Sequence, residues 1–515
     1  NHQPVRLSIN TKYEHLQMRS PKKDPSAISW CKVTSEVVTQ YRHLLQSELS
    51  SIPLNHDALS CSNNLCSENG HHIAISTLCK DIIATCIKAG SQTFPKVKPK
   101  GKRRPFWSEK VKGAKSKSIF WGKIWRESGR PKSGIVADIM RSARKEYHQA
   151  VDEIKRMDTQ MRRVRMFQSM SKGDSRNFWR ELKKLDSNAN RITPRIGPAS
   201  TNEDIAALFS KKYEALYNSV PTDKSTIDEL KESINAGLHT ERQLNITVDD
   251  VLSAVKMLKH DKSDGGPGLW SNHIIYAKDI LAPYLCHLIT AIFTHGFTPE
   301  EFLTASLISL PKDTSASLSD MNNYRGISLA SCITKIIDWI VIKKFSPQLA
   351  SSDLQFAFKQ KHSTSMCSFV VKEVATYYMN RGSEVFTCML DASKAFDRVH
   401  HGKLFHVLMK RVLPFTVLRL LLDMYEKQQL RTTWNGVSTA YFSCSNGVKQ
   451  GGVLSPILFT LYLDELINEL KESGIGCHIG GTYVGVVSYA DDITLLCPSP
   501  NGLQKMVDIC TAFGI

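Results

Sequence analysis

The sequence predicts an α+β fold, because short apolar strands and long amphipathic helices occur in the same chain. The clearest strands flank residues 488–493, where apolar runs on both sides of a short polar tip indicate a β-hairpin. Residues 385–390 are a further short apolar run that suits a buried strand. Apolar side chains recur every three or four positions over residues 134–186 and indicate a long helix. A chain of 515 residues exceeds one hydrophobic core, so we expect roughly two to four domains.

The N-terminal half is expected to be mostly helical. From the N-terminus, the expected elements are a strand over residues 1–10, helices over 28–54 and 73–87, a polar loop over 56–73, and the long helix over 134–186. That long helix is expected to break at Gly173, because glycine is a poor helix former.

From residue 246 onward, both strands and helices are expected. Thr247 can cap the helix that follows it, and Pro414 is expected to interrupt the helical stretch over 402–427. Asn435-Gly436 between two strand-like runs is a strong hairpin signal. The other expected elements are strands over 307–310 and 323–329, helices over 333–345, 364–380 and 501–513, and a helix that Pro456 opens.

Composition narrows the class of protein. The net charge is +18, from 67 basic and 49 acidic residues, and such an excess favours a polyanionic partner because neutralised phosphates release counterions. No apolar run reaches the roughly 18 residues of a membrane span, so no membrane partner is expected. The thirteen cysteines show no paired framework and are expected to be reduced thiols of an intracellular protein, in the nucleus and cytoplasm.

Three acidic residues carry the strongest chemical signal. Asp491 and Asp492 lie side by side at the tip of the predicted hairpin, and Asp391 ends the predicted strand over residues 385–390. Adjacent carboxylates repel each other, so each pKa would rise unless a cation lies between them. A hard divalent ion such as Mg²⁺ takes oxygen ligands and leaves room for substrate phosphates. An isolated Asp-Asp pair is usually a solvated turn, but the third acid upstream favours a metal site.

Three segments in this order resemble motifs A, B and C of a reverse transcriptase. They are Phe386 to Asp397, Gly447-Val448-Lys449-Gln450-Gly451, and Tyr489-Ala490-Asp491-Asp492. The alanine in the third segment and the Ser-Lys-Ala-Phe-Asp run in the first resemble the non-LTR (LINE-type) retrotransposon branch. The resemblance implies an RNA-directed DNA polymerase that uses template RNA, a DNA primer and dNTPs, with two Mg²⁺ ions (or Mn²⁺) as cofactors.

The resemblance also implies a right-hand polymerase fold and a division into domains. Fingers are followed by a palm that has an antiparallel sheet with helices, and a mostly helical basic extension precedes both. The expected domains are an endonuclease tail over residues 1–10, the N-terminal extension over 11–245, fingers over 246–375 and a truncated palm over 376–515, with the reverse transcriptase domain overall at about 290–515. The thumb is expected to be missing, so the chain is expected to be a fragment of a polyprotein that binds RNA but by itself extends a primer poorly or not at all.

Site residues follow from the same resemblance. Asp391, Asp491 and Asp492 would be catalytic and would hold the metal ions, with Asp492 the weakest ligand, whereas Asp397 is expected to serve structure. The residues expected to bind the nucleotide are Lys312, Arg325, Phe396, Gln450 and Gly451. Among these, Phe396 would be an aromatic gate against a 2′-hydroxyl, and Gln450 would lie against the nucleotide sugar and base.

Two basic segments are candidates for binding nucleic acid. Residues 94–126 combine many lysines and arginines with aromatic side chains, a mixture that suits phosphates and stacked bases. The residues expected to contact RNA there are Lys100, Lys102, Arg103 and Arg104; a solvated linker is the alternative. Lys262 lies in a glycine-rich basic loop over residues 259–268, which would let backbone amides approach phosphates. A plain turn is the alternative for this loop.

A cluster of potential zinc ligands occurs near the N-terminus. Its members are Cys61, Cys66, His71 and His72. Their spacing does not match common short zinc knuckles, and the polar residues around them indicate a loop. The sequence therefore favours a loop without a metal ion at this place.

Two other functions stay open. A decayed or domesticated element would only bind RNA, although the intact acids argue against it. A right-hand polymerase that copies DNA alone is disfavoured by the Tyr-Ala-Asp-Asp hairpin and by the basic N-terminal half.

Overall fold

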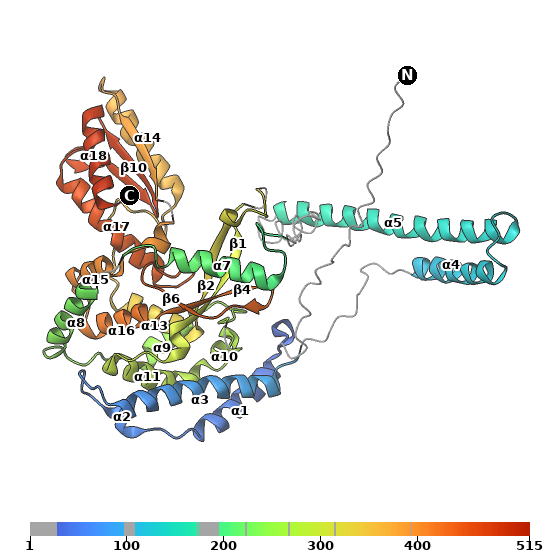
Figure 1. Ribbon diagram of the computed structural model, residues 1–515, viewed down its shortest axis with the longest axis horizontal. Helices are drawn as coiled ribbons and strands as arrows, with labels where there is room; N and C mark the ends of the chain where they lie inside the picture. The colour runs from blue at the N-terminus through green and yellow to red at the C-terminus, as the bar shows by residue number, and fades with distance from the viewer. Residues whose placement is uncertain are drawn as a thin grey trace. The chain divides into compact units, whose positions relative to one another are not determined.

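The computed structural model describes residues 28–96, 109–171, 174, 195–221, 224–265, 268–313, 316–392 and 394–514 (Figure 1). The protein is of mixed α/β type, as the sequence predicts at this coarse level. The chain forms two compact units, one of residues 1–18 and 98–193 and one of residues 19–97 and 194–515. No helix in these described ranges is long and apolar enough to cross a membrane.

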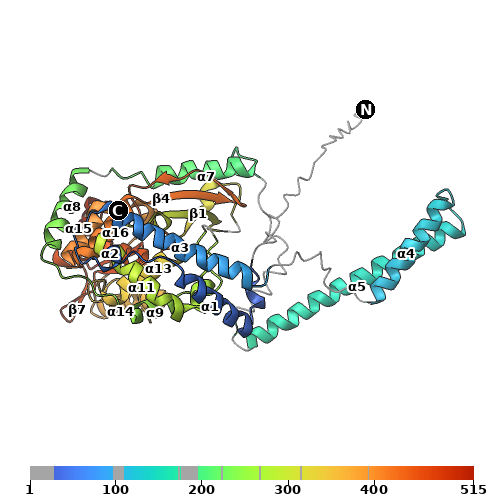
Figure 2. The ribbon, with the colours of Figure 1, turned by 90° about the horizontal axis from the view of Figure 1, so that it is seen from below.

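The first unit contains a helical hairpin. Its helices, α4 (Glu109–Glu127) and α5 (Ile135–Ser171), lie side by side (Figures 1 and 2). The side chains buried between them are those of Val111, Ala114 and Ala150. Small alanines let two helices approach closely, so this contact buries little apolar surface. The helix predicted over residues 134–186 is confirmed from residue 135 to residue 171.

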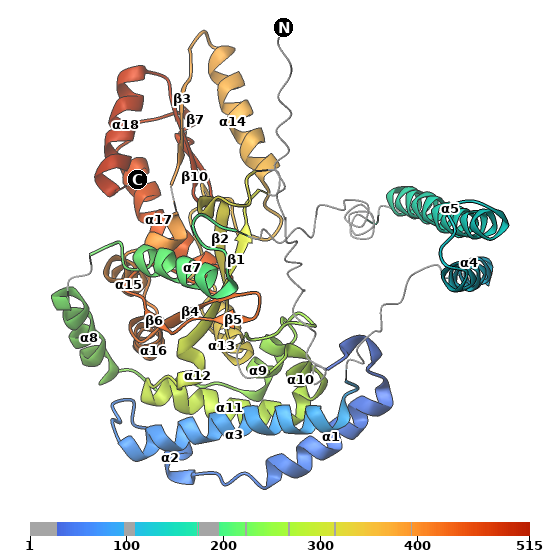
Figure 3. The same cartoon turned by 45° about the vertical axis from the view of Figure 1, so that its right-hand side comes forward.

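In the second unit, helices from distant parts of the sequence share one large core. α1 (Ser35–Ser50) and α3 (Asn69–Thr93) pack together, and α3 packs on α11 (Lys278–His295) (Figures 1 and 3). The Tyr41 hydroxyl donates a hydrogen bond of 3.1 Å to the carbonyl of His273. Further helices of this core are α2 (His56–Ser60), α8 (Lys224–Leu238), α9 (Val248–Val255), α10 (Ser271–Tyr276), α12 (Glu300–Leu303), α13 (Cys332–Lys344), α15 (His401–Lys410) and α16 (Phe415–Glu426).

Local capping decides where several of these helices begin. The Thr247 side chain accepts a hydrogen bond of 3.2 Å from the amide of Asp250, so the predicted cap of α9 is confirmed. Pro414 is the N-cap of α16 and separates it from α15, as predicted. The loop predicted over residues 56–73 is wrong in part, because Asn55 accepts a hydrogen bond from the amide of Ala58 and starts α2.

The first sheet has the strand order β2-β1-β4-β5, and β6 also pairs with β4. β1 pairs antiparallel with β2 and parallel with β4. Between β4 and β5, Asn435 and Gly436 have φ angles of 47° and 85°, which a tight hairpin turn requires. α7 (Asn202–Leu216) covers this sheet with Phe209 and Tyr213. The strands are β1 (Thr304–Pro311), β2 (Tyr324–Leu329), β4 (Gln429–Trp434), β5 (Val437–Ser438) and β6 (Phe442–Ser443).

The second sheet has the antiparallel order β3-β10-β9. Its strands are β3 (Phe386–Asp391), β9 (Val486–Tyr489) and β10 (Asp492–Cys497). α17 (Ser455–Glu472) and α18 (Pro500–Phe513) cover one face, and α14 (Thr364–Met379) packs against β9 (Figure 3). Side chains alternate along β3, so Thr387, Met389 and Asp391 are exposed on the other face. The short strands β7 (His478–Ile479) and β8 (Thr482–Tyr483) pair beside this sheet.

Candidate active site

The tip of the β9–β10 hairpin is held by one buried side chain. Ala490 and Asp491 form a two-residue turn, and Ala490 has a φ angle of 56°. The side-chain amide of Gln355 accepts a hydrogen bond of 2.9 Å from the Ala490 amide and donates one of 3.3 Å to the Ala490 carbonyl. It also donates to the Ser488 hydroxyl at 2.8 Å. Gln355 is fully buried, so it fixes the turn that presents Asp491.

The structure brings the three predicted acids together. Asp391 lies directly opposite Asp492 in the register of β3 and β10, and the amide of Ala392 donates a hydrogen bond of 3.4 Å to the carbonyl of Asp491. Burial raises the pKa of the Asp491 carboxyl, and the charges of Asp492 and Asp391 raise it further. Three neighbouring carboxylates, of which Asp491 has its pKa raised by the charges of the other two, fit a site for a divalent cation, which would remove the repulsion.

A pocket of about 580 Å³ opens beside Asp491. All five predicted nucleotide-binding residues line it, namely Lys312, Arg325, Phe396, Gln450 and Gly451. They come from the end of β1, from β2, from the segment after β3 and from the loop before α17. Residues that are more than a hundred positions apart in the sequence therefore meet at one cavity, next to the acids.

The loop over residues 447–452 is tied to its neighbours through its backbone. The amide of Ser328 donates a hydrogen bond of 2.7 Å to the carbonyl of Gln450, and the amide of Val448 donates one of 2.8 Å to the carbonyl of Phe396. At Gly451, φ is +106° and a Cβ would lie 2.8 Å from the carbonyl oxygen of Ser328. Only glycine allows this loop to cross the end of β2 so closely.

Asp397 connects two segments of the chain through hydrogen bonds, which agrees with the structural role that the sequence predicts for it. Its carboxylate accepts a hydrogen bond of 2.8 Å from the Gln450 side chain, and its carbonyl accepts one of 2.6 Å from the Asn446 side chain. Burial raises the pKa of Asp397, whereas hydrogen bonds from Tyr217 and Gln450 lower it. Asp397 thus orients the amide of Gln450 at the pocket wall.

Phe396 forms an aromatic wall of the pocket. Its ring stacks on Phe459 with centroids 4.2 Å apart and planes at 19°. The ring of Phe358 is nearly perpendicular to it, with centroids 6.1 Å apart. Because the rings restrain one another, Phe396 keeps its position beside the segment that follows Asp391.

Two lysines that sequence reasoning did not single out also line the pocket. Lys212 comes from α7 and Lys394 from the turn after β3. The Lys212 ammonium donates hydrogen bonds to the carbonyls of Met321 and Tyr324. Burial lowers the pKa of Lys212 to about 8, and the nearby charges of Lys312 and Lys394 contribute. The pocket therefore gathers four cations, which include Lys312 and Arg325.

Comparison with known proteins places these motifs in a family. The family model described as "Reverse transcriptase (RNA-dependent DNA polymerase)" matches residues 310–515. This part of the chain is a reverse transcriptase domain. Curated proteins from a mobile element, a retrotransposable element and a transposon are also similar to the chain.

Three relatives show how far the similarity extends along the chain. The RNA-directed DNA polymerase from mobile element jockey of Drosophila funebris is 24% identical over 364 residues, 67% of this chain and 39% of the relative. The Pol polyprotein from type-2 retrotransposable element R2DM of Drosophila melanogaster is 25% identical over 45% of this chain and 22% of its own length. The transposon TX1 149 kDa protein of Xenopus laevis is 25% identical over 67% of this chain and 27% of its own length.

These figures mean that the chain spans between about a fifth and two fifths of the relatives' lengths. Among solved structures, apo telomerase from Candida Tropicalis matches over 68% of this chain and 80% of its own, with 11% identity and a TM-score of 0.32. Telomerase from Candida albicans, in complex with a fragment of telomeric RNA, matches over 63% of this chain and 64% of its own, with 11% identity and a TM-score of 0.30.

Of the predicted nucleic-acid contacts, only Lys262 belongs to the described part of the chain, and it lies away from the pocket beside Asp491. Lys262 is exposed on its loop, where its amide donates a hydrogen bond of 3.1 Å to the hydroxyl of Ser271, and it does not line the pocket. The other predicted contacts, Lys100, Lys102, Arg103 and Arg104, lie outside the described residues.

Proposed function

We propose that this chain carries the active site of an RNA-directed DNA polymerase, which copies RNA by adding deoxynucleotides to a primer 3′-hydroxyl. One observation carries the proposal. The pocket beside Asp491 combines cations and an aromatic wall with three neighbouring carboxylates. Phosphoryl transfer needs these groups together, because the triphosphate requires positive charge and the reacting oxygens require stabilisation.

The triphosphate would lie against the cations of the pocket. Lys312 and Arg325 enter from the β1–β2 hairpin, where the amide of Lys312 donates a hydrogen bond of 2.7 Å to the carbonyl of Asn323. Lys394 enters from the segment after β3. Fixed positive charge of this kind stabilises the negative charge that develops on the phosphates.

Asp391 and Asp491, with Asp492 beside them, would hold two Mg²⁺ ions, or Mn²⁺, because carboxylate oxygens suit hard cations. When bound, such ions would stabilise the attacking and leaving oxygens of the transfer. The chain itself keeps the carboxylates in place. Strand pairing fixes Asp391 against Asp492, and the Gln355 amide fixes the turn before Asp491.

Sugar selection would fall to Phe396 and Gln450. The stacked ring of Phe396 would leave no space for a 2′-hydroxyl, and the amide of Gln450, oriented by Asp397, would lie against the sugar and base. These two residues would therefore favour dNTPs over ribonucleotides.

The remaining surfaces suggest where the nucleic acid lies. In this proposal the β1–β2 hairpin belongs to the fingers (residues 246–375), and the sheet β3-β10-β9 belongs to the palm (residues 376–515). Template RNA and DNA primer would lie over the open face of that sheet, where Met389 is 76% exposed beside Asp391. The first unit would add phosphate contacts through exposed cations of α5, which include Arg141, Arg144, Lys145 and Arg156.

Primer extension on an RNA template tests the proposal directly. In a complete polymerase that carries this chain, Asp391→Asn or Asp491→Asn is expected to lower the rate of dNTP addition by at least about 100-fold, because each removes charge at the reacting oxygens. RNA binding should stay within about twofold of the original, since neither acid contacts template phosphates. Asp508→Asn, which alters an exposed acid of α18, is the matched control and should leave the rate unchanged.

The same experiment separates the alternatives. Synthesis above a few per cent in either acid variant would contradict the assignment of the site. RNA binding with no incorporation by the unaltered complete polymerase would favour a decayed element that only binds RNA. Extension on a DNA template alone would favour a DNA-copying polymerase.

A further inference from the structure

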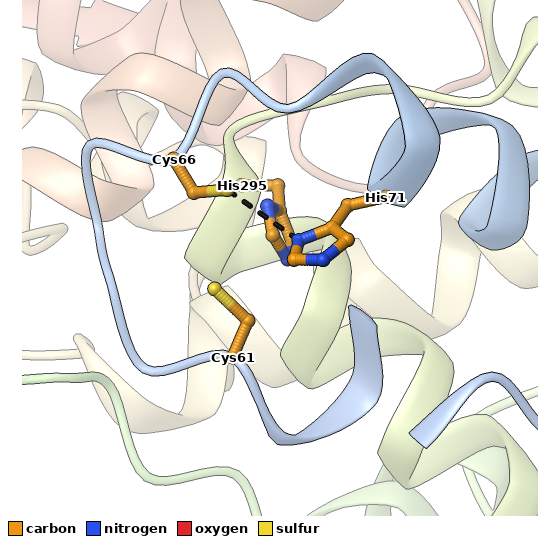
Figure 4. Close-up of side chains that lie close together, drawn as sticks. All are labelled: Cys61, Cys66, His71 and His295. Atoms are coloured by element: carbon orange, nitrogen blue, oxygen red, sulfur yellow. Dashed lines mark hydrogen bonds between the residues drawn. The ribbon is translucent and has the colours of Figure 1, made fainter. Parts of the chain in front are cut away.

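Four side chains with metal-binding chemistry gather in the second unit, and none of them lines the pocket beside Asp491. They are Cys61, Cys66, His71 and His295, and one potential ligand atom from each lies within 4.8 Å of the others (Figure 4). Cys61 follows α2, Cys66 lies in the next turn, His71 is in the first turn of α3, and His295 ends α11. The group therefore joins three separate elements.

The sequence alone suggests Cys61, Cys66 and His71, but it suggests His72 in place of His295. His72 was the neighbouring candidate, but its ring stacks on Phe297 with centroids 4.4 Å apart and planes at 7°. His295 takes the fourth place, with its ring perpendicular to that of His71 and the centroids 5.1 Å apart. It lies more than two hundred residues further along the chain, so no spacing rule in the sequence connects it with the cysteines.

The distance between one pair of these atoms fits a tetrahedral ion. Cys66 Sγ lies 3.4 Å from Nδ1 of His71. In a tetrahedral zinc site, with bonds of about 2.3 Å to sulfur and about 2.0 Å to nitrogen, a sulfur and a nitrogen lie about 3.6 Å apart. The two side chains therefore have nearly the separation that a shared ion requires, without a shift of the backbone.

Hydrogen bonds orient both imidazoles toward this arrangement. Nε2 of His71 is 3.1 Å from the carboxylate of Glu68, and Nε2 of His295 is 3.2 Å from the carbonyl of Ala58. Carbonyl and carboxylate oxygens only accept, so each Nε2 carries the hydrogen and each Nδ1 keeps a lone pair. A histidine that binds a metal commonly donates its other N–H to such an oxygen.

Nδ1 of His295 supplies an independent indication. This nitrogen is buried and has no hydrogen-bond partner among the described residues, and the whole side chain is only 4% exposed. A buried acceptor without a partner costs free energy, roughly 1–3 kcal/mol. A bound cation would satisfy it.

We propose that Cys61, Cys66, His71 and His295 bind a structural Zn²⁺ ion. Two thiolates and two imidazoles are the donor set that zinc takes in closed four-coordinate sites, which leave no position for a substrate. The ion would hold the segment between α2 and α3 against the end of α11. The Arg419 guanidinium already links the same places, since it donates hydrogen bonds to the carbonyls of Asn64 and Thr294.

The zinc content of the purified, untagged chain is the first test. The chain, expressed with zinc and passed through a desalting column, is expected to hold about one zinc per molecule. Cys66→Ser and His295→Gln should each lower that content at least about fivefold, because each removes one of four ligands. His72→Gln and Cys367→Ser are matched controls outside the cluster and should keep the zinc of the original chain.

A second measurement does not depend on how the variants fold. The unaltered chain, stripped of metal with a chelator, is titrated with Co²⁺ while its absorption spectrum is recorded. A tetrahedral site with two thiolates is expected to give intense visible d–d bands and a thiolate-to-cobalt charge-transfer band, both saturating near one equivalent. Zinc below about a tenth of an equivalent together with the absence of these bands would overturn the proposal, as would full zinc retention in both ligand variants.

Discussion

At the scale of single residues, the motifs locate several residues of the candidate site, but not all of the pocket. Asp391, Asp491 and Phe396 were predictable because each belongs to a short run with its own local pattern. Lys212 was not predictable in this way. It lies on α7, far upstream in the sequence, and only the packing of that helix on β2 brings its ammonium to the pocket.

The side chain of Phe396 is predicted to choose between sugars. Phe396→Ala should open the wall beside the nucleotide sugar and raise ribonucleotide incorporation relative to dNTPs by about tenfold or more, since one lost steric contact is worth about 1–3 kcal/mol of discrimination. Single-nucleotide incorporation with paired dNTP and NTP substrates measures the ratio. Phe369→Ala, which alters an exposed aromatic residue of α14 away from the pocket, is the control. An unchanged ratio in Phe396→Ala would make this residue part of the core only.

The pKa of Lys212 predicts a pH dependence of triphosphate binding. Burial lowers this pKa from 10.5 to about 8, so the ammonium loses its proton as the pH rises through about 8. The pocket then loses one positive charge, and dNTP affinity should fall above pH 8 with a slope of up to about one logarithmic unit per pH unit. Below pH 8 Lys212 keeps its charge, so it should cause little further change in dNTP affinity.

Equilibrium dNTP binding between pH 6.5 and pH 9.5 provides the measurement. Lys212→Arg should flatten the profile, because a guanidinium stays charged throughout this range. An equally steep profile in Lys212→Arg would show that another group titrates.

At the scale of elements, the sequence predicts most strands and helices but not the contacts that lock them together. The hairpin β9–β10 follows from its alternating pattern and its Asp-Asp tip. Its support by Gln355 does not follow, because residues 354–356 have no clear pattern and meet β9 through one isolated β-bridge, between Gln355 and Ser488. The short helix α2 was missed for a related reason, since its start depends on the capping side chain of Asn55 and not on periodicity.

The amide of Gln355 is predicted to stabilise the catalytic turn. Gln355→Leu would leave the buried amides of Ala490 and Ala357 without their acceptor, at a cost of roughly 1–3 kcal/mol for each unpaired group. Chemical denaturation should show this loss of stability, and amide hydrogen exchange should increase at residues 488–492. Gln360→Leu, at an exposed position nearby, is the control. Unchanged exchange at the turn would mean that the hairpin needs no such support.

At the scale of the whole molecule, charge and motif order point to a nucleic-acid polymerase, whereas the division into units does not follow from the sequence. The helices over residues 35–93 look like part of one basic extension, yet they share a core with α11 and α16. The hairpin of α4 and α5 belongs to a separate unit with a small core of its own. Periodicity shows which face of a helix is apolar, but not which distant helix covers it.

The basic segment is predicted to contribute to RNA affinity through phosphate contacts. Replacing Lys100, Lys102, Arg103 and Arg104 together with alanine should weaken RNA binding and reduce its salt slope by up to about four, because each lost phosphate contact removes roughly one released counterion. Binding curves between 50 and 300 mM salt measure the slope. A set of four exposed lysines from the second unit that includes Lys471 and Lys505 is the charge-matched control. An unchanged slope would make the segment a linker.

The shared core of the second unit has a consequence for the order in which the chain can fold during synthesis. Tyr41 is bonded to His273, which is 232 positions later, so α1 and α3 reach their partners only after a long stretch has been translated. At about 5–20 residues per second, that wait is on the order of ten to fifty seconds. During this time the apolar surface that α1 and α3 later bury against α10 and α11 has no native cover on the ribosome. Successful production of the protein therefore depends on whatever shields that surface, and slower translation would lengthen the exposure.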